Sequence, residues 1–151
     1  MIDEQDRIIL NRLTIDARVP WAELAQELGL SAPAVADRVK RLKQRGFIRG
    51  FHAILDPSTL GLGLVAYVAV TLTHPRDRAE FLTMVRERAE IKEAHHLAGA
   101  DDYMLKVYCR DTGHLEHFLT DILKSVPGVQ RTRTSIVLGT AKELPTVAPI
   151  E

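Results

Sequence analysis

The sequence contains a single cysteine, Cys109, among 151 residues. An intrachain disulfide is therefore excluded, and a reducing compartment is the simplest inference. Long apolar runs are also missing, because the longest, Leu60 to Leu72, has only 13 residues and includes two glycines. A helix that spans a bilayer needs about 20 apolar residues. The chain opens with acidic and polar residues and shows no signal peptide. These features predict a cytoplasmic protein without membrane contact.

The chain has no net charge, since 20 basic residues balance 20 acidic ones. The charges are nevertheless unevenly distributed. Residues 1–55 contain nine basic and seven acidic side chains, and the remainder contains 11 and 13, so the two parts have net charges of +2 and −2. This distribution indicates an N-terminal module that contacts a polyanion and a C-terminal module that does not.

The stretch from Trp21 to Phe51 predicts two helices joined by a tight turn and followed by a short basic hairpin. Gly29 is suited to end the first helix, and Ser31 is a natural N-cap for the second. Residues 3–15 are predicted to form an additional helix that supports both through Ile9 and Leu13. The apolar stripes expected to pack together are Leu24, Ala25 and Leu28 in one helix and Val35, Val39 and Leu42 in the next.

From Ser31 to Phe51 the chain has six basic residues and one acid, Asp37, a net charge of +5. A basic helix can be merely a solvated surface. Here it follows a helix and a tight turn, and its diameter suits the major groove of DNA. We therefore predict a winged helix-turn-helix that binds double-stranded DNA. The candidate contacts are Ser31, Pro33, Ala34 and Arg38 near base edges, with Arg38 able to bind guanine, and Lys40, Arg41 and Arg49 on phosphates.

The remaining chain predicts a second domain of strands and helices in the order β-α-β-β-α-β. This order is the ferredoxin-like arrangement, an antiparallel sheet with both helices on one face. The fold class is thus α+β, with a DNA-binding domain over 1–55, a linker at 56–62, the ferredoxin-like domain at 63–140 and a tail at 141–151. The expected strands are 51–55, 64–72, 91–98, 103–109 and 129–138, and the expected helices are 76–89 and 112–125.

Strand 64–72 has apolar residues on both of its faces. Leu64, Ala66 and Val68 alternate with Val65 and Tyr67, although helices are available to cover only one face. A partner is expected on the other face, and a homodimer is the simplest solution. A dimer would also suit a helix-turn-helix that reads adjacent half-sites.

Several motifs in sequence order resemble those of the Lrp/AsnC, or feast/famine, transcriptional regulators. They are Asp3-x-x-Asp6-Arg7-x-Ile9-Leu10, Glu23-Leu24-Ala25, Gly29-Leu30-Ser31, Val35-x-x-Arg38-Val39-x-x-Leu42, Gly46-x-Ile48-x-Gly50, Gly99-Ala100-Asp101-Asp102-Tyr103-x-Leu105-Lys106 and Pro127-Gly128-Val129-x-x-Thr132-x-Thr134. The resemblance covers nearly the whole chain. It implies a homodimer that assembles to a tetramer or octamer in a bacterial or archaeal cytoplasm, associated with the nucleoid.

The resemblance also implies an amino acid or related metabolite as effector, bound between neighbouring dimers. Asp102 can pair with an α-ammonium group, and backbone N–H groups of a glycine turn can hold a carboxylate. A plain β-turn is the alternative for this loop. Many family members have Asp where this chain has Ala100, so either Asp101 and Asp102 do that work or the pocket differs. Some members have no known effector, so a regulator of the same fold without one stays open. The candidate effector residues are His96, Ala98, Gly99, Asp102, Thr134 and Ser135.

No enzyme, cofactor or metal site is predicted. The sequence shows no phosphate loop and no nucleophile with an adjacent base. His114 and His117 share a helix face but have no third ligand at suitable spacing. A third alternative is an interaction module whose basic helix binds an acidic protein. Affinity for DNA that falls steeply as salt rises would distinguish the DNA-binding protein from an enzyme and from the interaction module.

Overall fold

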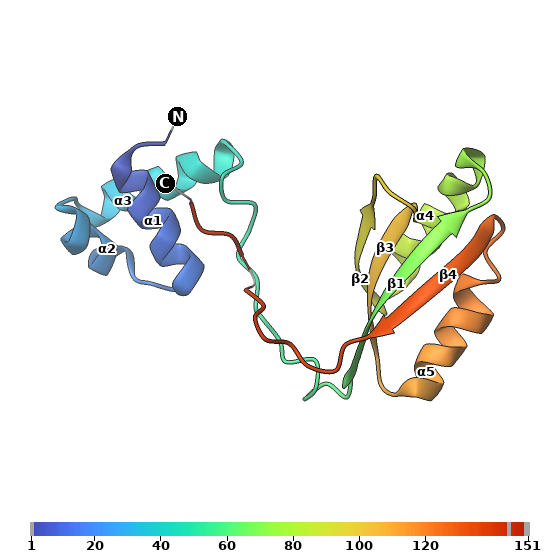
Figure 1. Cartoon of the computed structure of the whole chain (residues 1–151). Coiled ribbons are helices and arrows are strands. Elements are labelled where there is room, and N and C mark those ends of the chain that lie inside the picture. Colours follow the sequence, from blue (N-terminus) through green and yellow to red (C-terminus); the bar gives the residue numbers. More distant parts are fainter. Residues whose placement is uncertain (1, 145, 150–151) are drawn as a thin grey trace. The chain divides into compact units, whose positions relative to one another are not determined.

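Three helices build the N-terminal unit in the computed structural model, which describes residues 2–144 and 146–149 (Figure 1). They are α1 (Glu4–Ile15), α2 (Trp21–Leu28) and α3 (Ala32–Gln44). The predicted apolar stripes meet in one core, where Ile9, Leu24 and Val35 are fully buried. The described residues at 142–144 and 146–149 belong to this unit, whereas residues 55–141 form a second one.

The ends of these helices follow the local sequence. Asp3 caps α1 and forms a capping box with Asp6, whose backbone N–H donates to the Asp3 carboxylate at 2.8 Å. Gly29 ends α2 with a φ of +63°, a conformation that favours glycine. Ser31 caps α3 as predicted, accepting a hydrogen bond from the backbone N–H of Ala34. By contrast, Pro20 at the start of α2 makes no side-chain cap.

The predicted strand at residues 51–55 and its basic hairpin are wrong for this structure. No strand is present anywhere between residues 46 and 63, a stretch that the structure describes in full. A strand requires a hydrogen-bonded neighbour, and the described residues of this unit provide none. The helix-turn-helix therefore has no wing in a single chain, and Ile54 and Leu55 stay largely exposed.

The second unit is a four-stranded antiparallel sheet in the order β2-β3-β1-β4. This order and both crossing helices confirm the ferredoxin-like prediction. The final helix changes from α to π geometry within the segment expected to be one α-helix. The elements are β1 (Leu64–Leu72), the short 3₁₀ turn η1 (Pro75–Asp77), α4 (Arg78–Glu87), β2 (Ile91–His96), β3 (Tyr103–Cys109), α5 (Thr112–His117), its π-helical continuation η2 (Phe118–Leu123) and β4 (Val129–Ile136).

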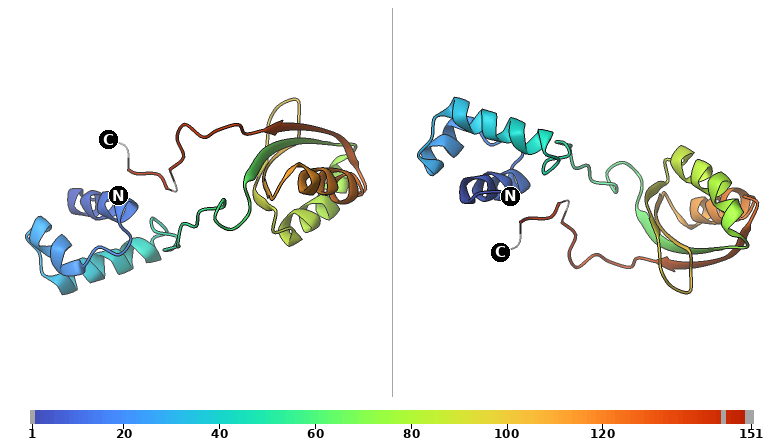
Figure 2. Two further views of the ribbon diagram at one scale, coloured as in Figure 1. Left: turned by 90° about the horizontal axis from the view of Figure 1, so that it is seen from below. Right: turned by 90° about the horizontal axis from the view of Figure 1, so that it is seen from above.

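Both helices cover the same face of the sheet (Figure 2). The register places Val68 of β1 opposite Leu105 of β3 and Thr134 of β4. Side chains at alternate positions of β1 and β3 meet Phe81 of α4 and Phe118 of η2 in one buried core. In β3 the residues that alternate with Cys109 face this core, and in β1 the core takes Ala66, Val68 and Val70.

The other face of the sheet has no helix and is less apolar than the sequence suggested. Tyr67 in its centre is 40% exposed. Charged side chains from the neighbouring strands flank this apolar strip, because β3 contributes Lys106 and β4 contributes Arg131 and Arg133. We call this surface, defined by Val65, Tyr67, Ala69, Met104, Lys106, Tyr108, Arg131 and Arg133, the open face.

Gly128, in the turn before β4, lies against Asp77 at the end of η1, and this contact can be tested. It has a φ of +85°, and a Cβ added there would lie 2.2 Å from the Cβ of Asp77. Gly61 has a similar φ of +77° but nothing within 4 Å of the added atom. We expect Gly61→Ala to lower the free energy of unfolding by about 1–2 kcal/mol, the cost of left-handed backbone alone. Gly128→Ala should cost clearly more in urea denaturation followed by circular dichroism, and equal losses would contradict this packing.

Candidate nucleic-acid interface

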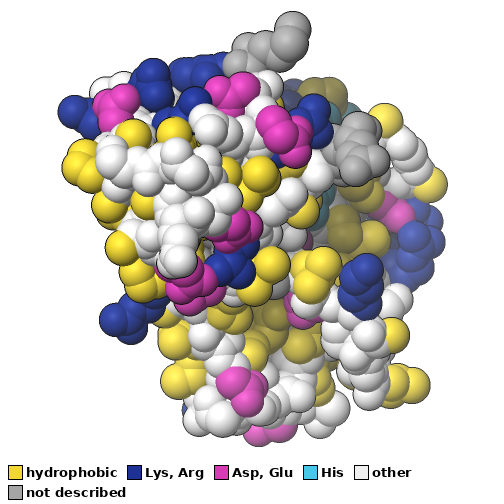
Figure 3. Space-filling model, turned by 90° about the vertical axis from the view of Figure 1, so that its left-hand side faces the viewer, with side chains coloured by type: hydrophobic (Ala, Val, Ile, Leu, Met, Phe, Trp, Pro, Cys, Tyr) yellow, Lys and Arg dark blue, Asp and Glu magenta, His cyan; other side chains and the backbone are white. Residues whose placement is uncertain are grey.

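One face of α3 is free of the helical core and forms a continuous exposed stripe. The stripe lies opposite the buried residues Val35, Val39 and Leu42. Its members recur at intervals of three or four residues, as one face of an α-helix requires. They are Pro33, Asp37, Lys40, Arg41 and Gln44. We call this set the α3 stripe. Figure 3 shows Lys and Arg side chains gathered along the upper edge of the face viewed there, interspersed with Asp and Glu.

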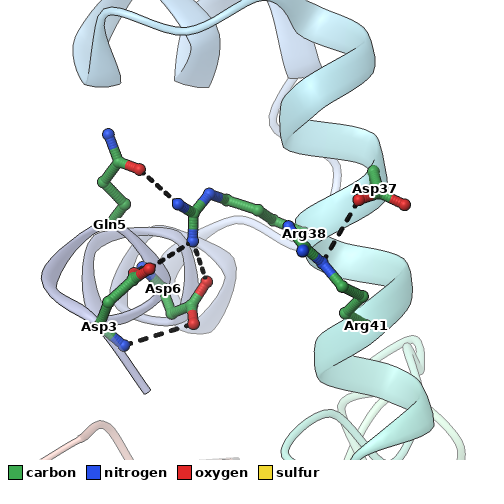
Figure 4. Close-up of polar contacts among 6 residues, drawn as sticks. All are labelled: Asp3, Gln5, Asp6, Asp37, Arg38 and Arg41. Carbon is green, nitrogen blue, oxygen red and sulfur yellow. Dashed lines mark hydrogen bonds and ion pairs between the residues drawn. The ribbon is translucent and has the colours of Figure 1, made fainter. Parts of the chain in front are cut away.

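Arg38 lies outside the α3 stripe and points at α1 (Figure 4). Its guanidinium donates to Asp3 at 2.7 Å, to Asp6 at 2.8 Å and to the Gln5 side chain at 2.6 Å. The Asp6 side chain is only 10% exposed, so this ion pair is largely shielded from water. Guanine reading by Arg38 stays a prediction; here its Nη1 donates to two carboxylates and its Nη2 to the Gln5 amide oxygen, so the guanidinium is held against α1.

The contact between Asp3 and Arg38 also stabilises the charged forms of these two residues. The backbone N–H of Asp6 and then the Arg38 guanidinium lower the pKa of Asp3. Hydrogen bonds to Asp3 and Asp6 raise the pKa of Arg38. The cluster therefore holds α3 against α1 as an ion pair at neutral pH. We call these four residues, Asp3, Gln5, Asp6 and Arg38, the α1–α3 clamp.

Two basic residues of the stripe differ in their surroundings. Arg41 forms an ion pair with Asp37 at 3.3 Å, and both side chains are more than half exposed. Lys40 lies next to them on the exposed surface. In the last turn of α3, Lys43 lies over the ring of Phe51, 5.8 Å from its centroid. Just after the helix, Arg45 lies over the ring of Phe47 at 4.9 Å. These cation–π contacts position charge at the C-terminal end of α3.

The other predicted DNA contacts lie on or beside this surface. Ser31 and Pro33 are exposed at the N-terminus of α3, and Ala34 is half-buried. Arg49 is exposed in the segment after the helix. Sequence reasoning missed Gln44 and gave Asp37 no role. The spacing from Pro33 through Asp37 and Lys40 could have identified both, because it continues directly to Gln44.

The predicted effector residues do not form one site within a single chain. His96 is on edge strand β2, whereas Thr134 and Ser135 are on the opposite edge strand β4. Three inter-strand spacings correspond to roughly 14 Å. His96 instead stacks on Tyr103, with ring centroids 5.0 Å apart. The Tyr103 hydroxyl is buried and has no hydrogen-bond partner among the described residues.

The loop between β2 and β3 is held by its ends. The backbone N–H of Leu97 donates to the carbonyl of Asp102 at 2.8 Å. The Asp102 carboxylate in turn accepts the backbone N–H of Leu72 at 2.7 Å, so it ties the loop to the end of β1. Ala98 and Gly99 are exposed between these anchors. The structure thus gives Asp102 a structural contact, and its role toward an effector stays a prediction.

Asp101 forms a charge cluster that sequence reasoning did not find. Its side chain is only 7% exposed. The carboxylate accepts hydrogen bonds from Arg133 at 2.7 Å and from Arg131 and Thr71 at 3.3 Å each. These partners come from β1 and β4, about 30 residues away in either direction along the chain. The buried Asp101 carboxylate of the loop therefore lies beside two arginines of β4.

Other candidate chemistry finds little support in the residues that the structure describes. Burial raises the pKa of Cys109 to about 11, which opposes a nucleophilic thiolate. His114 faces Glu90 at 3.6 Å, and His117 faces Asp121 at 2.7 Å. Residues 2–144 and 146–149 contain no group of three or more metal-ligating side chains. Within the same residues, no helix has the length and apolarity needed to cross a bilayer.

A helix-turn-helix with an exposed basic stripe, followed by a separate ferredoxin-like unit, defines a DNA-binding transcriptional regulator with two functional parts. Family models divide the chain in the same way. An AsnC-type helix-turn-helix domain matches residues 2–43, and an Lrp/AsnC ligand binding domain matches residues 65–147. The chain belongs to the Lrp/AsnC family of transcriptional regulators.

Relatives along the whole chain agree with this assignment. The proline dehydrogenase transcriptional activator of Rhizobium radiobacter is 38% identical over 144 residues, which cover 94% of this chain and 92% of the relative. The leucine-responsive regulatory protein of Escherichia coli K12 is also 38% identical, covering 94% and 88%. A transcriptional regulator of Neisseria meningitidis, solved in complex with L-Met, superposes with a TM-score of 0.93 at 31% identity and covers 97% and 96%.

The α1–α3 clamp predicts a difference between two arginines of the same helix. Arg38→Ala would leave Asp6 buried without its partner and should lower the free energy of unfolding by about 2–4 kcal/mol. Arg41→Ala removes only an exposed pair and should cost less than about 0.5 kcal/mol. Fluorescence of Trp21, the single tryptophan of the chain, reports unfolding of this unit in urea. If Arg38→Ala were as stable as Arg41→Ala and lost only specific DNA binding, the result would contradict the clamp and support base readout by Arg38.

Proposed function

We propose that the chain is a regulator that inserts α3 into the major groove of double-stranded DNA and responds to an amino acid. The observation that carries the proposal is the α3 stripe, a helix face left exposed by a packed helix-turn-helix. Small residues at the start of α3 allow close approach to base edges. In this scheme Arg38 is a positioning residue, because it sets the orientation of α3 on α1.

The side chains around the stripe suggest separate roles. Lys40, Arg41 and Arg49 would bind phosphates and set the register of α3 on the duplex. Ser31, Pro33 and Ala34 would lie near base edges. Gln44 adds an amide that can bind phosphate or base. Asp37 lowers the positive potential of the stripe and can accept from cytosine, which would limit binding to the wrong sequences.

The loop between β2 and β3 supports an amino-acid site on chemical grounds. No hydrogen bond within the described chain involves the backbone N–H groups of Ala98, Gly99 and Ala100, which can receive a carboxylate. Gly99 is not required by its backbone, since its φ is not positive and a Cβ would meet nothing within 4 Å. The amino acid bound by the Neisseria relative is L-Met.

The alternative is a DNA-organising regulator of the same fold without an effector. One observation favours it: the Asp102 carboxylate already accepts the Leu72 N–H, so its capacity for an α-ammonium group is reduced. His96 also lies across the sheet from Thr134 and Ser135. A complete site would therefore need residues from more than one chain. We propose a homodimer that assembles further, to a tetramer or octamer, in a bacterial or archaeal cytoplasm at the nucleoid.

The open face is the surface that a second copy would cover. Its centre is apolar, with Tyr67 40% exposed and Ala69 only 2% exposed between longer side chains. Arg131 and Arg133 line one edge, and Glu93, paired with Lys106 at 3.7 Å, lies toward the other. With the two open faces in contact, a two-fold axis parallel to β1 would bring Arg131 and Arg133 of one copy toward Glu93 of its partner.

DNA binding and effector response can be separated in one experiment. A fluorescent duplex from the protein's own upstream region is titrated at several salt concentrations, with and without the twenty amino acids. Lys40→Ala should reduce the slope of log K against log salt by about 0.9, the value for one phosphate contact. Gly99→Ala should leave stability and DNA affinity unchanged but abolish the shift caused by amino acids, because a methyl group would obstruct the loop N–H groups.

The outcomes distinguish the proposed functions. Binding that ignores the amino acids in the wild-type chain would support the regulator without an effector. Binding no tighter than to random duplex, at every salt concentration, would contradict the DNA-reading role and favour an acidic protein partner. Asp102→Asn serves as a matched control, since its amide oxygen can still accept from Leu72. Loss of response in this variant with normal stability would assign the Asp102 charge to the effector.

The proposed dimer is tested by mass. Tyr67→Glu places a charge in the centre of the open face without disturbing the helix-covered core. We expect analytical ultracentrifugation to show a dimer or larger species for the wild type and a shift toward monomer for this variant. Thr83→Glu, on exposed α4, adds the same charge elsewhere and should leave the mass unchanged. A wild-type monomer at micromolar concentration would contradict the proposal.

A further inference from the structure

A basic groove runs along η1 and α4, on the sheet unit and away from the open face. It has a volume of about 510 Å³. Three arginines and one threonine contribute its polar groups, and its floor is apolar. No acidic side chain lines it. The lining residues are Pro75, Arg76, Arg78, Ala79, Leu82, Thr83 and Arg86. We call this surface the α4 groove.

The positive charge of the α4 groove is poorly neutralised by the described residues. Arg76 is 3.9 Å from Asp77, at the limit of an ion pair, and its side chain is 82% exposed. Arg78 and Arg86 form no ion pair with any described residue. The two acids of α4, Glu80 and Glu87, are exposed but do not line the groove. Two of the three guanidinium groups therefore have no carboxylate partner among the described residues, and the third has only the exposed contact with Asp77.

Arg78 is held in place without losing its charge. Its guanidinium carbon lies 5.9 Å from the ring centre of Tyr103, which packs between Phe81 and His96. A cation–π contact orients a guanidinium while leaving its edge donors available for an anion. Thr83 is ordered as well, because its hydroxyl donates to the carbonyl of Ala79 at 3.0 Å. The groove is thus partly preorganised for an anionic partner.

The shape of the groove favours a polyanion over a small metabolite. Sites for small ligands usually bury most of the ligand, about 70–90% of its surface. Here all lining residues except Leu82 are exposed. Arginines at the surface still gain affinity for nucleic acid, because each phosphate contact releases condensed counterions. Arg78 and Arg86 are eight residues apart, so they spread charge over about 12 Å of helix, comparable to three or four phosphate steps of one DNA strand.

We propose that the α4 groove is a second DNA-backbone contact, which holds duplex lying beyond the segment bound by α3. The proposal rests on the DNA binding proposed above and extends it to the sheet unit. It revises the expectation from net charge that this unit does not contact a polyanion, because the arginines of the α4 groove are gathered locally within a part of the chain whose net charge is −2. The contact adds affinity without sequence preference, since guanidinium groups bind phosphates. It makes binding of long duplexes tighter and more salt-dependent than binding of a duplex that carries one half-site.

The test compares two duplexes with the same half-site, one short and one flanked by random sequence. The groove variant changes Arg76, Arg78 and Arg86 to Ala. A matched variant changes Lys92, Arg110 and Lys124 to Ala, which removes the same charge from exposed positions of the same unit outside the groove. On the long duplex, the groove variant should lower the slope of log K against log salt by about 2.7, or 0.9 for each of three contacts. The matched variant should change it much less, and both should bind the short duplex as the wild type does.

Each other result overturns the proposal. Equal losses for the two variants on the long duplex would show only a general effect of charge. Unchanged binding by the groove variant, with pyrophosphate raising the melting temperature of the wild type alone, would assign the groove to a small anion. A wild-type chain that binds neither duplex would mean that the DNA-reading role itself has failed.

A second variant tests the role of charge. Replacing the three arginines by Lys should restore most of the slope that the alanine variant loses, because counterion release depends on charge.

Discussion

The orientation of α3 depends on a polar contact between helices that are far apart in the sequence. Eight buried apolar side chains form the core of the N-terminal unit, and apolar packing alone is tolerant of small rotations. The Arg38 guanidinium is not, because its planar donors must match two carboxylates and an amide oxygen at once. The exposed α3 stripe keeps one orientation relative to α1 only as long as this contact holds. In the proposed complex with DNA, specificity would therefore depend on a residue that need not touch DNA.

In the sheet unit, too, acidic side chains connect segments that are far apart in the sequence. β1 pairs with β3 on one side and β4 on the other, so it is the strand on which the others are aligned. Asp101 and Asp102 then attach the loop after β2 to the end of β1 and to the arginines of β4. A movement of this loop would be felt at both edges of the sheet. In the proposed regulator, this connection would link an effector bound at the loop to the open face that a second copy would cover.

The sequence was sufficient for those parts that depend on local pattern. Periodic apolar residues located every helix and the strands of the sheet, and Gly29 and Ser31 marked the turn of the helix-turn-helix. The expected strand at 51–55 failed because a strand exists only with a neighbour, which local pattern cannot supply. The pairing of Arg38 was not foreseen, because its partners Asp3 and Asp6 lie more than 30 residues earlier. Likewise, no spacing rule indicated that Asp101 would meet Arg133. Which side chains pair across elements is decided by the packing, and the effector residues depend in addition on other chains.

The position of Asp3 has a practical consequence. One carboxylate at the start of α1 caps the helix and binds Arg38 at the same time. An affinity tag or fusion partner joined to the first residue would place new charge and bulk beside that carboxylate. Such a preparation could fold normally and still present α3 at a slightly altered angle, so that promoter preference measured with it would belong to the tagged protein. The position of a purification tag thus affects which DNA sequences the preparation prefers.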